Sequence, residues 1–348
     1  MKISIILPLY NAEKFIEEAI TSVQYQTYNN WELIIIDDQS TDSSYKIASK
    51  FLTDKRINIF QNDLNRGLSY SLNKGIGLAS GSYIARMDAD DICLRDRLSV
   101  QLEYLQKHPY VDVLGANCVK FDEEGKFEVS NVITSNASIK AYLFIACPFI
   151  HPTMMIKRSY LIKFNLTYDH QYYRAEDYAL WGDMIDSAYF ANIENVVLKY
   201  RVLSNSETRL ADLDKIKKFE VFTMIHRSIL KKINVELSSQ EQYIYTSLML
   251  KWNIVNIKGI KISEIEIIFY KILNCAIQKA WVEDVKKIEK MLSKRLIVFL
   301  IYSGKFKEIS QYKFVLSSQY FYIGIWAYLC EYLGDKYFKI LKWKEKDL

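Results

Sequence analysis

The first 120 residues alternate between short apolar runs and segments with helical spacing, and this alternation restricts the fold most. The run ISIILPL at 3–9 is continuously apolar, as expected for a parallel strand covered on both faces. Apolar residues from Phe15 to Val23 then recur at helical spacing. Strands that alternate with helices are typical of βαβ units. We therefore predict an α/β fold with a Rossmann-like, mostly parallel central sheet and helices on both faces.

The same pattern continues along the chain and then changes. Further strands are predicted at 32–37, 57–60 and 82–87, with helices near 42–52, 68–79 and 95–107. Beyond residue 108 the pattern loosens, and strands are predicted at 111–119, near 127–133, at 153–157 and at 196–202. From about residue 210 apolar residues keep a helical period, as at 262–280 and 282–301. We predict one domain over residues 1–204 and an all-α C-terminal extension over residues 205–348.

The charge is unevenly distributed between these two parts. Residues 205–348 carry 25 Lys and Arg against 16 Asp and Glu, whereas residues 1–204 carry 21 against 25. A basic segment suits an anionic surface. Residues 321–346 also mix Trp, Tyr and Phe with Lys, which is typical of helices that lie in a membrane interface. We expect an anionic membrane surface as a partner of the extension, with packing or a homo-oligomer contact as the alternative, and no nucleic acid.

Membrane insertion and disulfide bonding are not expected. No apolar run approaches the roughly 20 residues that a spanning helix needs. The chain passes from Met1 straight into a strand pattern, without the features of a signal peptide. The five cysteines are an odd number without a CxxC pair, so neither a disulfide framework nor a zinc site is indicated. We expect a cytoplasmic protein, with peripheral attachment to the inner face of the cell membrane left open.

Polar residues follow each of the first four predicted strands. They are Tyr10 and Asn11, Asp37 and Asp38, residues 62–67, and residues 88–91. Ligands of open α/β sheets bind beyond the carboxyl ends of the strands. These residues are therefore expected to meet in one cleft.

The segment MDADD at 87–91 is the strongest candidate for a metal site. On an extended segment, Asp88 and Asp90 would present both carboxylates to the same side. Two adjacent carboxylates repel each other unless a cation lies between them, and Mg²⁺ or Mn²⁺ takes such oxygen ligands while bridging to substrate phosphates. The alternative is an Asp-rich turn in which Asp90 or Asp91 caps the next helix.

An ordered series of segments resembles family 2 of the glycosyltransferases, inverting enzymes with the GT-A fold. The series runs ILPLYNAEKFIEEAITSVQYQTYNNWELIIIDDQSTDSS, NRGLSYSLNKGIGLASGSYIARMDADDICLRDRL, HPTMMIKRS, AEDYALW and KYR. It covers about residues 3–204 and most closely resembles bacterial enzymes that extend lipooligosaccharide or capsule chains. The resemblance implies a UDP-sugar donor.

The resemblance also assigns donor-binding positions. It places Pro8, Leu9, Tyr10 and Glu13 around the nucleobase and ribose, Arg66 near the diphosphate, Asp88 and Ala89 at the sugar nucleotide, Asp90 with Asp88 on the metal, and Asp91 in support. It implies that Asp38 accepts a hydrogen bond from the uracil imide, which suits an ionised, acceptor-only carboxylate. Alternatively, Asp37 or Asp38 forms an N-cap or Asx turn, and Arg66 is a solvated loop cation.

The segment AEDYALW at 175–181 supplies the catalytic candidates. An acceptor hydroxyl that attacks the anomeric carbon must lose its proton to a positioned base. By the resemblance Asp177 is that base and Glu176 its neighbour. The alternative is that Asp177 caps a helix that begins at Tyr178.

Two further positions remain open in the sequence. Relatives often carry a metal-reaching histidine after the YR strand, whereas this chain reads Tyr200-Arg201-Val202-Leu203. Ser204 or Asn205, water, or no protein group would take that place. His151 matches a family position near the sugar or acceptor, but a structural role is equally compatible.

The sequence therefore predicts an inverting transferase that moves a hexose or N-acetylhexosamine from a UDP-sugar to a glycan acceptor, with Mn²⁺ or Mg²⁺ as cofactor. The acceptor would be lipid-linked, in the synthesis of a bacterial lipooligosaccharide, capsule or exopolysaccharide. A nucleotidyltransferase is one alternative, although PLYNAEKF lacks a glycine-rich, basic triphosphate loop. A non-catalytic sugar-nucleotide-binding module is the other.

Overall fold

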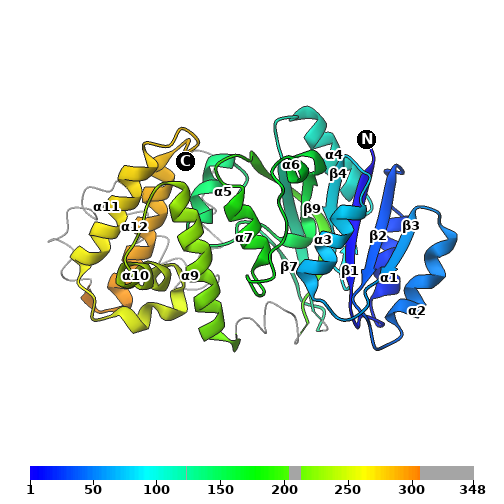
Figure 1. Cartoon of the computed structure of the whole chain (residues 1–348), viewed down its shortest axis with the longest axis horizontal. Helices are drawn as coiled ribbons and strands as arrows, with labels where there is room; N and C mark the ends of the chain where they lie inside the picture. Colours follow the sequence, from blue (N-terminus) through cyan, green and yellow to red (C-terminus); the bar gives the residue numbers. More distant parts are fainter. Residues whose placement is uncertain (123, 204–212, 306–348) are drawn as a thin grey trace. The chain divides into compact units, whose positions relative to one another are not determined.

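A computed structural model of the chain describes residues 1–122, 124–203 and 213–305 (Figure 1). The chain forms two compact units. The first comprises Met1–Leu143 and Cys147–Val221, and the second comprises Phe144–Ala146 and the residues from Phe222 onward. The predicted boundary at residue 205 stays a prediction, because residues 204–212 lie outside the described ranges.

In the described part of the first unit, nine strands form one sheet. Eight of them have the order β3-β2-β1-β4-β8-β6-β9-β5, and β7 pairs with β6. The strands are β1 (Ile3–Leu9), β2 (Trp31–Asp37), β3 (Ile57–Gln61), β4 (Tyr83–Arg86), β5 (Ile92–Cys93), β6 (Val113–Phe121), β7 (Phe127–Val129), β8 (Met155–Lys157) and β9 (Phe190–Arg201). The first four strands are parallel to one another, and β8 runs antiparallel to β4 and β6. The predicted α/β fold is confirmed.

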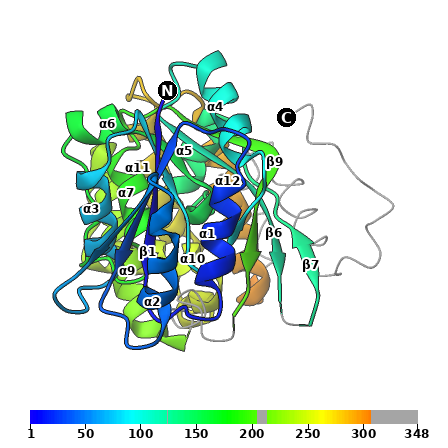
Figure 2. The same cartoon turned by 90° about the vertical axis from the view of Figure 1, so that its right-hand side faces the viewer.

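Helices cover both faces of this sheet, as predicted. Consecutive residues of β1 point to opposite faces of the sheet. Ile5 joins the core cluster that also contains Ile20 of α1 (Ile16–Gln24), while Ile6 faces Gly75 of α3 (Leu68–Leu78). Figure 2 shows α1 and α3 on opposite sides of β1. Among the described residues up to 203, the other helices are α2 (Ser44–Ser49), α4 (Arg97–Lys107), α5 (Asn136–Leu143), α6 (Arg158–Lys163) and α7 (Glu176–Asp183), with 3-10 turns at Lys50–Thr53 and His151–Thr153.

One predicted strand begins six residues too late. β9 starts at Phe190 rather than at residue 196, because polar residues interrupt the apolar run that signals a strand. Asn192 is buried there, and its side-chain amide donates to the Ile133 carbonyl at 2.7 Å. The strand therefore tolerates a buried amide whose Nδ2 is hydrogen-bonded, although its Oδ1 has no hydrogen-bond partner among the described residues.

The described part of the second unit is helical, as predicted. It contains most of α9 (Lys215–Lys232), α10 (Ser239–Met249), a 3-10 turn (Lys251–Ile257), α11 (Ile262–Ala276) and α12 (Val285–Tyr302). Ser238 and Glu241 form a capping box that starts α10. The aromatic segment 321–346 lies outside the described residues.

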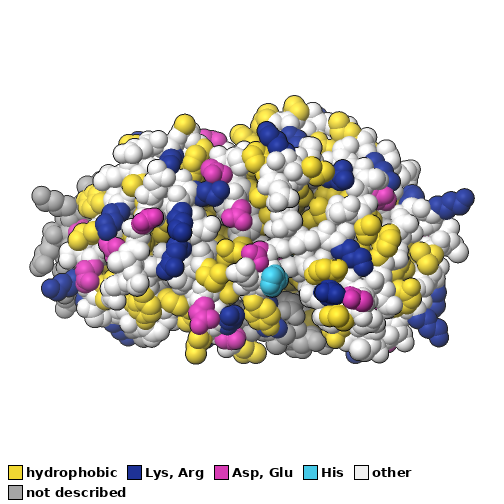
Figure 3. Space-filling view, viewed as in Figure 1, with side chains coloured by type: hydrophobic (Ala, Val, Ile, Leu, Met, Phe, Trp, Pro, Cys, Tyr) yellow, Lys and Arg dark blue, Asp and Glu magenta, His cyan; other side chains and the backbone are white. Residues whose placement is uncertain are grey.

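Within the described ranges, none of the helices combines the length and apolarity needed to span a membrane. On the face drawn in Figure 3, basic and acidic side chains are interspersed, with apolar side chains scattered among them.

Candidate active site

The carboxyl ends of the first parallel strands come to one edge of the sheet, as predicted. Leu9, Asp37 and Gln61 are neighbours in register at the ends of β1, β2 and β3. The loops that follow are joined directly, since Asp38 N donates to the Leu9 carbonyl and Asn62 N donates to the Asp37 carbonyl, each at 2.8 Å. The nucleotide-side candidates therefore share this edge.

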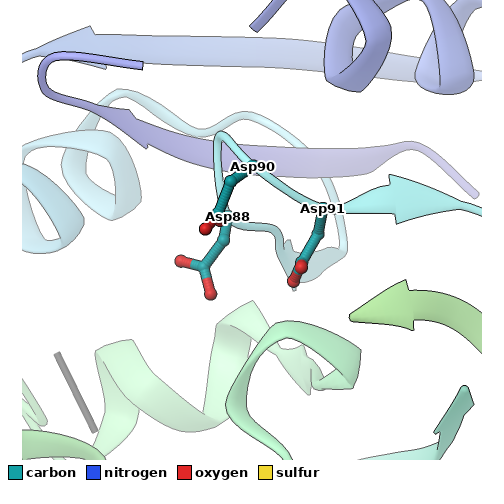
Figure 4. Close-up of side chains that lie close together, drawn as sticks. All are labelled: Asp88, Asp90 and Asp91. Carbon is teal, nitrogen blue, oxygen red and sulfur yellow. The ribbon is translucent and has the colours of Figure 1, made fainter. Parts of the chain in front are cut away.

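The segment after β4 is a turn rather than the extended segment predicted. Asp91 N donates to the Asp88 carbonyl at 3.4 Å, and the chain then enters β5. This turn brings a third carboxylate to the pair, so that ligand oxygens of Asp88, Asp90 and Asp91 lie within 4.8 Å of one another (Figure 4). Neither Asp90 nor Asp91 caps a helix, because α4 begins only at Arg97 with Asp96 at its N-cap.

Burial and the negative charges of neighbouring carboxylates raise the pKa values of Asp90 and Asp91 in this acidic turn. Burial, and then the charge of Asp88, raises the pKa of Asp90 to about 6. Burial and the charges of both neighbours raise the pKa of Asp91 well above its usual value. Asp91 Oδ2 is buried and has no hydrogen-bond partner in the part of the chain that the structure describes. A set of oxygen ligands with an unsatisfied buried acceptor fits a hard divalent cation such as Mg²⁺ or Mn²⁺.

Arg201, at the end of β9, holds the acidic turn in place through hydrogen bonds to Asp90 and Asp91. Its backbone N donates to Asp91 Oδ1 and its Nε to the Asp90 carbonyl, both at 2.9 Å. Its Nη2 donates to Glu18 Oε2 at 2.7 Å, and its guanidinium lies 4.7 and 4.5 Å from the ring centres of Phe15 and Phe121. The KYR segment thus holds the backbone of Asp90 and the side chain of Asp91.

Glu176 and Asp177 lie in the first turn of α7, whose N-cap is Ala175. Asp177 is therefore not the N-cap of this helix. Its Oδ1 accepts from the Tyr178 backbone N at 2.7 Å, and its Oδ2 accepts from the Cys147 thiol at 3.5 Å. Burial raises the pKa of Asp177, and burial together with the Asp177 charge raises the pKa of Glu176 to about 7.

One buried cation interacts electrostatically with both the acidic turn and this acidic pair. Arg86, the last residue of β4, is 5% exposed and forms an ion pair with Asp88. Its positive charge opposes the burial that raises the pKa values of Asp90, Glu176 and Asp177. The two groups of carboxylates therefore belong to one electrostatic site.

His151 lies beside this site. Its Nε2 is 2.8 Å from Tyr168 Oη, and burial lowers its pKa well below the usual value, so the ring is neutral. The Tyr168 backbone is held in turn by Asn73, which donates to the Tyr168 carbonyl at 2.7 Å and accepts from its N at 2.9 Å.

Asp38 organises the loop after β3. Its Oδ1 accepts from Asn62 Nδ2 at 2.7 Å and from Arg66 N at 2.9 Å, and its Oδ2 accepts from Gly67 N at 2.7 Å. Gly67 has a φ of 83°, which favours glycine. Since a carboxylate oxygen can accept two hydrogen bonds, Asp38 Oδ2 retains one acceptor position.

Asp37 accepts from Gln61 Nε2 at 2.8 Å. The helix α2 has Ser43 at its N-cap, so neither aspartate caps it.

The other predicted donor contacts lie around the same edge. Tyr10, which follows Pro8 and Leu9 at the end of β1, is 49% exposed, and Glu13 Oε2 accepts from Ser43 N at 2.9 Å. Ala89 is buried within the acidic turn. Arg66 makes two hydrogen bonds, of 2.8 and 2.7 Å, to Asp63 and lies over the Tyr70 ring. Ser204 and Asn205 lie outside the described residues.

Solved structures with a similar fold define the class. S. aureus TarS in complex with UDP-GlcNAc has a TM-score of 0.57 and 17% identity, over 88% of this chain and 92% of that chain. The mannosyltransferase PcManGT from Pyrobaculum calidifontis, in complex with GDP-Man and Mn²⁺, has a TM-score of 0.51 and 16% identity, over 86% of each chain. The fold is that of the GT-A glycosyltransferases.

The sequence comparisons identify the family. Residues 4–164 match the glycosyl transferase family 2 model. The putative glycosyltransferase EpsE of Bacillus subtilis is 34% identical over 60% of this chain and 76% of its own length. The Escherichia coli enzyme named UDP-Glc:alpha-D-GlcNAc-diphosphoundecaprenol beta-1,3-glucosyltransferase WfgD is 31% identical over 59% of this chain and 78% of its own length. The chain belongs to glycosyltransferase family 2.

Two residues at the site had no role in the sequence analysis. Arg86 could have been noticed, because it is a charged residue at the end of the apolar strand SYIAR and two positions before Asp88. Cys147 left no signal, since its hydrogen bond reaches Asp177 across 30 residues of chain.

Proposed function

We propose that this glycosyltransferase moves a hexose or N-acetylhexosamine from a UDP-sugar to a lipid-linked glycan acceptor, with inversion at the anomeric carbon. The observation that carries the proposal is the electrostatic interaction of Arg86 with both the acidic turn and the Glu176–Asp177 pair. Such a site provides carboxylates both for a cation next to a diphosphate and for a base next to an acceptor.

Asp177 is the proposed general base. Inverting transfer is a single displacement in which the acceptor hydroxyl attacks the anomeric carbon and loses its proton. A raised pKa makes Asp177 a better proton acceptor once it is ionised, and the hydrogen bonds from Tyr178 N and Cys147 hold its carboxylate in place. Glu176 has a pKa raised to about 7, so it is partly protonated near neutral pH.

Asp90 and Asp88 are the proposed ligands of Mn²⁺ or Mg²⁺, with Asp91 in support. When bound, a divalent cation supplies positive charge that stabilises the departing diphosphate. Arg201 keeps the turn in position through the Asp90 carbonyl and the Asp91 carboxylate. The Mn²⁺ in the PcManGT complex supports this assignment.

The names of the relatives support the proposed nucleotide and biological role. WfgD is named for a UDP-glucose donor and a diphosphoundecaprenol acceptor, and the similar AmsE of Erwinia amylovora for amylovoran biosynthesis. The TarS complex contains UDP-GlcNAc. These names support a UDP-sugar and a bacterial surface polysaccharide, whereas nothing observed favours a nucleotidyltransferase.

A donor panel tests the proposal. The full chain is incubated with Mn²⁺ or Mg²⁺ and each of several UDP-sugars, with GDP-mannose as the alternative nucleotide, and nucleoside diphosphate release is measured. We expect turnover of a UDP-hexose or UDP-N-acetylhexosamine. Turnover of GDP-mannose alone would contradict the proposed donor.

The base is tested by Asp177→Asn with the donor found in the panel. The amide retains the shape but accepts no proton, so donor affinity should stay within a few-fold while transfer falls by about 10²- to 10⁴-fold. Calorimetry measures the first quantity and product formation the second. Transfer within a few-fold of wild type would assign Asp177 a structural role in α7.

A further inference from the structure

Hydrogen bonds hold the backbone of Arg86 through both its N and its carbonyl. Its N donates to the Met154 carbonyl at 3.1 Å, and its carbonyl accepts from Arg97 Nη2 at 2.7 Å. Arg97 is itself fully buried and donates to the side chain of Gln101 at 3.2 Å. The backbone position from which the Arg86 side chain extends is therefore well defined.

The guanidinium of Arg86 is only partly satisfied. Its Nη1 donates to Asp88 Oδ2, and the side chain is 7% exposed. Its Nε is buried and has no acceptor among the described residues. A buried cation with an unused donor is costly unless a negative charge lies nearby, and Asp88 is its only ion-pair partner in the described ranges.

Asp88 therefore has two competing uses. It forms the ion pair with Arg86, and its carboxylate also contributes to the cluster of three that fits a divalent cation. A guanidinium and a metal ion next to the same carboxylate repel each other strongly where solvent is excluded. A nucleoside diphosphate would relieve this repulsion, because its negative charges attract both cations.

We propose that Arg86 is the resident counter-cation of Asp88 in the nucleotide-free enzyme, and that it makes divalent-metal binding depend on a nucleoside diphosphate. Metal and nucleotide then bind as a cooperative pair, and the free enzyme does not hold the metal tightly. Arg86 acts as a positioning residue through Asp88. The inference rests on the proposed metal site, and its test separates the two.

The test measures Mn²⁺ binding to the full chain by the electron paramagnetic resonance of free Mn²⁺, with and without UDP. For the wild type we expect UDP to tighten Mn²⁺ binding at least tenfold. Arg86→Met removes the charge at similar side-chain length, so Mn²⁺ should bind the UDP-free variant at least tenfold more tightly than the UDP-free wild type. The effect of UDP should shrink accordingly.

Two variants control the experiment. Arg86→Lys keeps the charge and should bind Mn²⁺ as the wild type does. Arg56→Met removes an arginine that pairs with Asp54 at the same sequence separation, over the Trp31 ring and apart from the acidic turn. It should leave Mn²⁺ binding unchanged.

The outcomes are distinct. Mn²⁺ affinity in Arg86→Met equal to or below that of the wild type would overturn the inference while leaving the metal site intact. Equal Mn²⁺ affinity of the wild type with and without UDP would also overturn it, even if Arg86→Met did not fold. A wild type that binds no Mn²⁺ in either condition would instead refute the proposed metal site itself.

Discussion

At the scale of single residues, the proposed base is tuned by two opposing effects. Burial raises the pKa of Asp177, whereas hydrogen bonds from the Tyr178 backbone and the Cys147 thiol lower it. A base works only when ionised, so transfer should fall as the pH drops through this pKa. The pH at which kcat falls on the acidic side of its pH profile, the acidic limb, therefore depends on the groups that contact Asp177.

Cys147→Ala removes the thiol that donates to Asp177 Oδ2. With one fewer hydrogen bond to the charged form, the pKa of Asp177 rises, and the acidic limb of the kcat profile should move to higher pH. Cys147→Ser retains a donor and should keep the limb near its original pH. Cys275→Ala, in α11 of the second unit, is the control and should not move it. A limb that stays in place in Cys147→Ala would show that the thiol does not tune the base.

At the scale of elements, the helix α3 packs unusually closely against the strand β1. A Cβ on Gly75 would lie 2.5 Å from Ile6 Cγ2 of β1, which is closer than a side chain permits. A Cβ on Gly77, in the same helix, would meet no atom within 4 Å. The packing of α3 against β1 therefore requires a glycine at position 75, whereas position 77 has room for a side chain.

Gly75→Ala should lower the free energy of unfolding by about 1–3 kcal/mol, because the added methyl group overpacks the interface between α3 and β1. Gly77→Ala should raise it by about 0.5–1 kcal/mol, because alanine is the better helix former and has room. Urea titration of both variants measures the two changes. Equal effects of the same sign would contradict the close approach at Gly75.

Periodicity predicted the elements well because burial on a sheet face or a helix face imposes it. The strand patterns predicted β1 to β4 nearly to the residue, whereas the start of β9 was missed because Asn192, Glu194 and Asn195 interrupt the apolar run. The contacts of the site could not be predicted in this way. The hydrogen bonds that join Asp38 to Arg66 and Gly67 connect separate loops, and no spacing in the sequence encodes them.

At the scale of the whole molecule, family membership fixes the reaction class, while the donor, the acceptor and the role of the basic extension are separate questions. Attachment to an anionic membrane stays a prediction from the charge of residues 205–348, and a homo-oligomer contact stays the alternative. The aromatic segment on which they partly depend, 321–346, lies outside the described residues. The central claim concerns the first unit alone: its acidic turn holds a metal that binds the diphosphate of the donor.

Calorimetry of UDP binding, with and without Mn²⁺, tests this claim most directly. The wild type should bind UDP at least tenfold more tightly with Mn²⁺, because the diphosphate otherwise faces carboxylates without a cation between them. Asp90→Ala should lose this gain, whereas Asp96→Ala, which removes an exposed carboxylate at the start of α4, should keep it. Equal UDP affinity of the wild type and Asp90→Ala, unaffected by Mn²⁺ in both, would contradict the account.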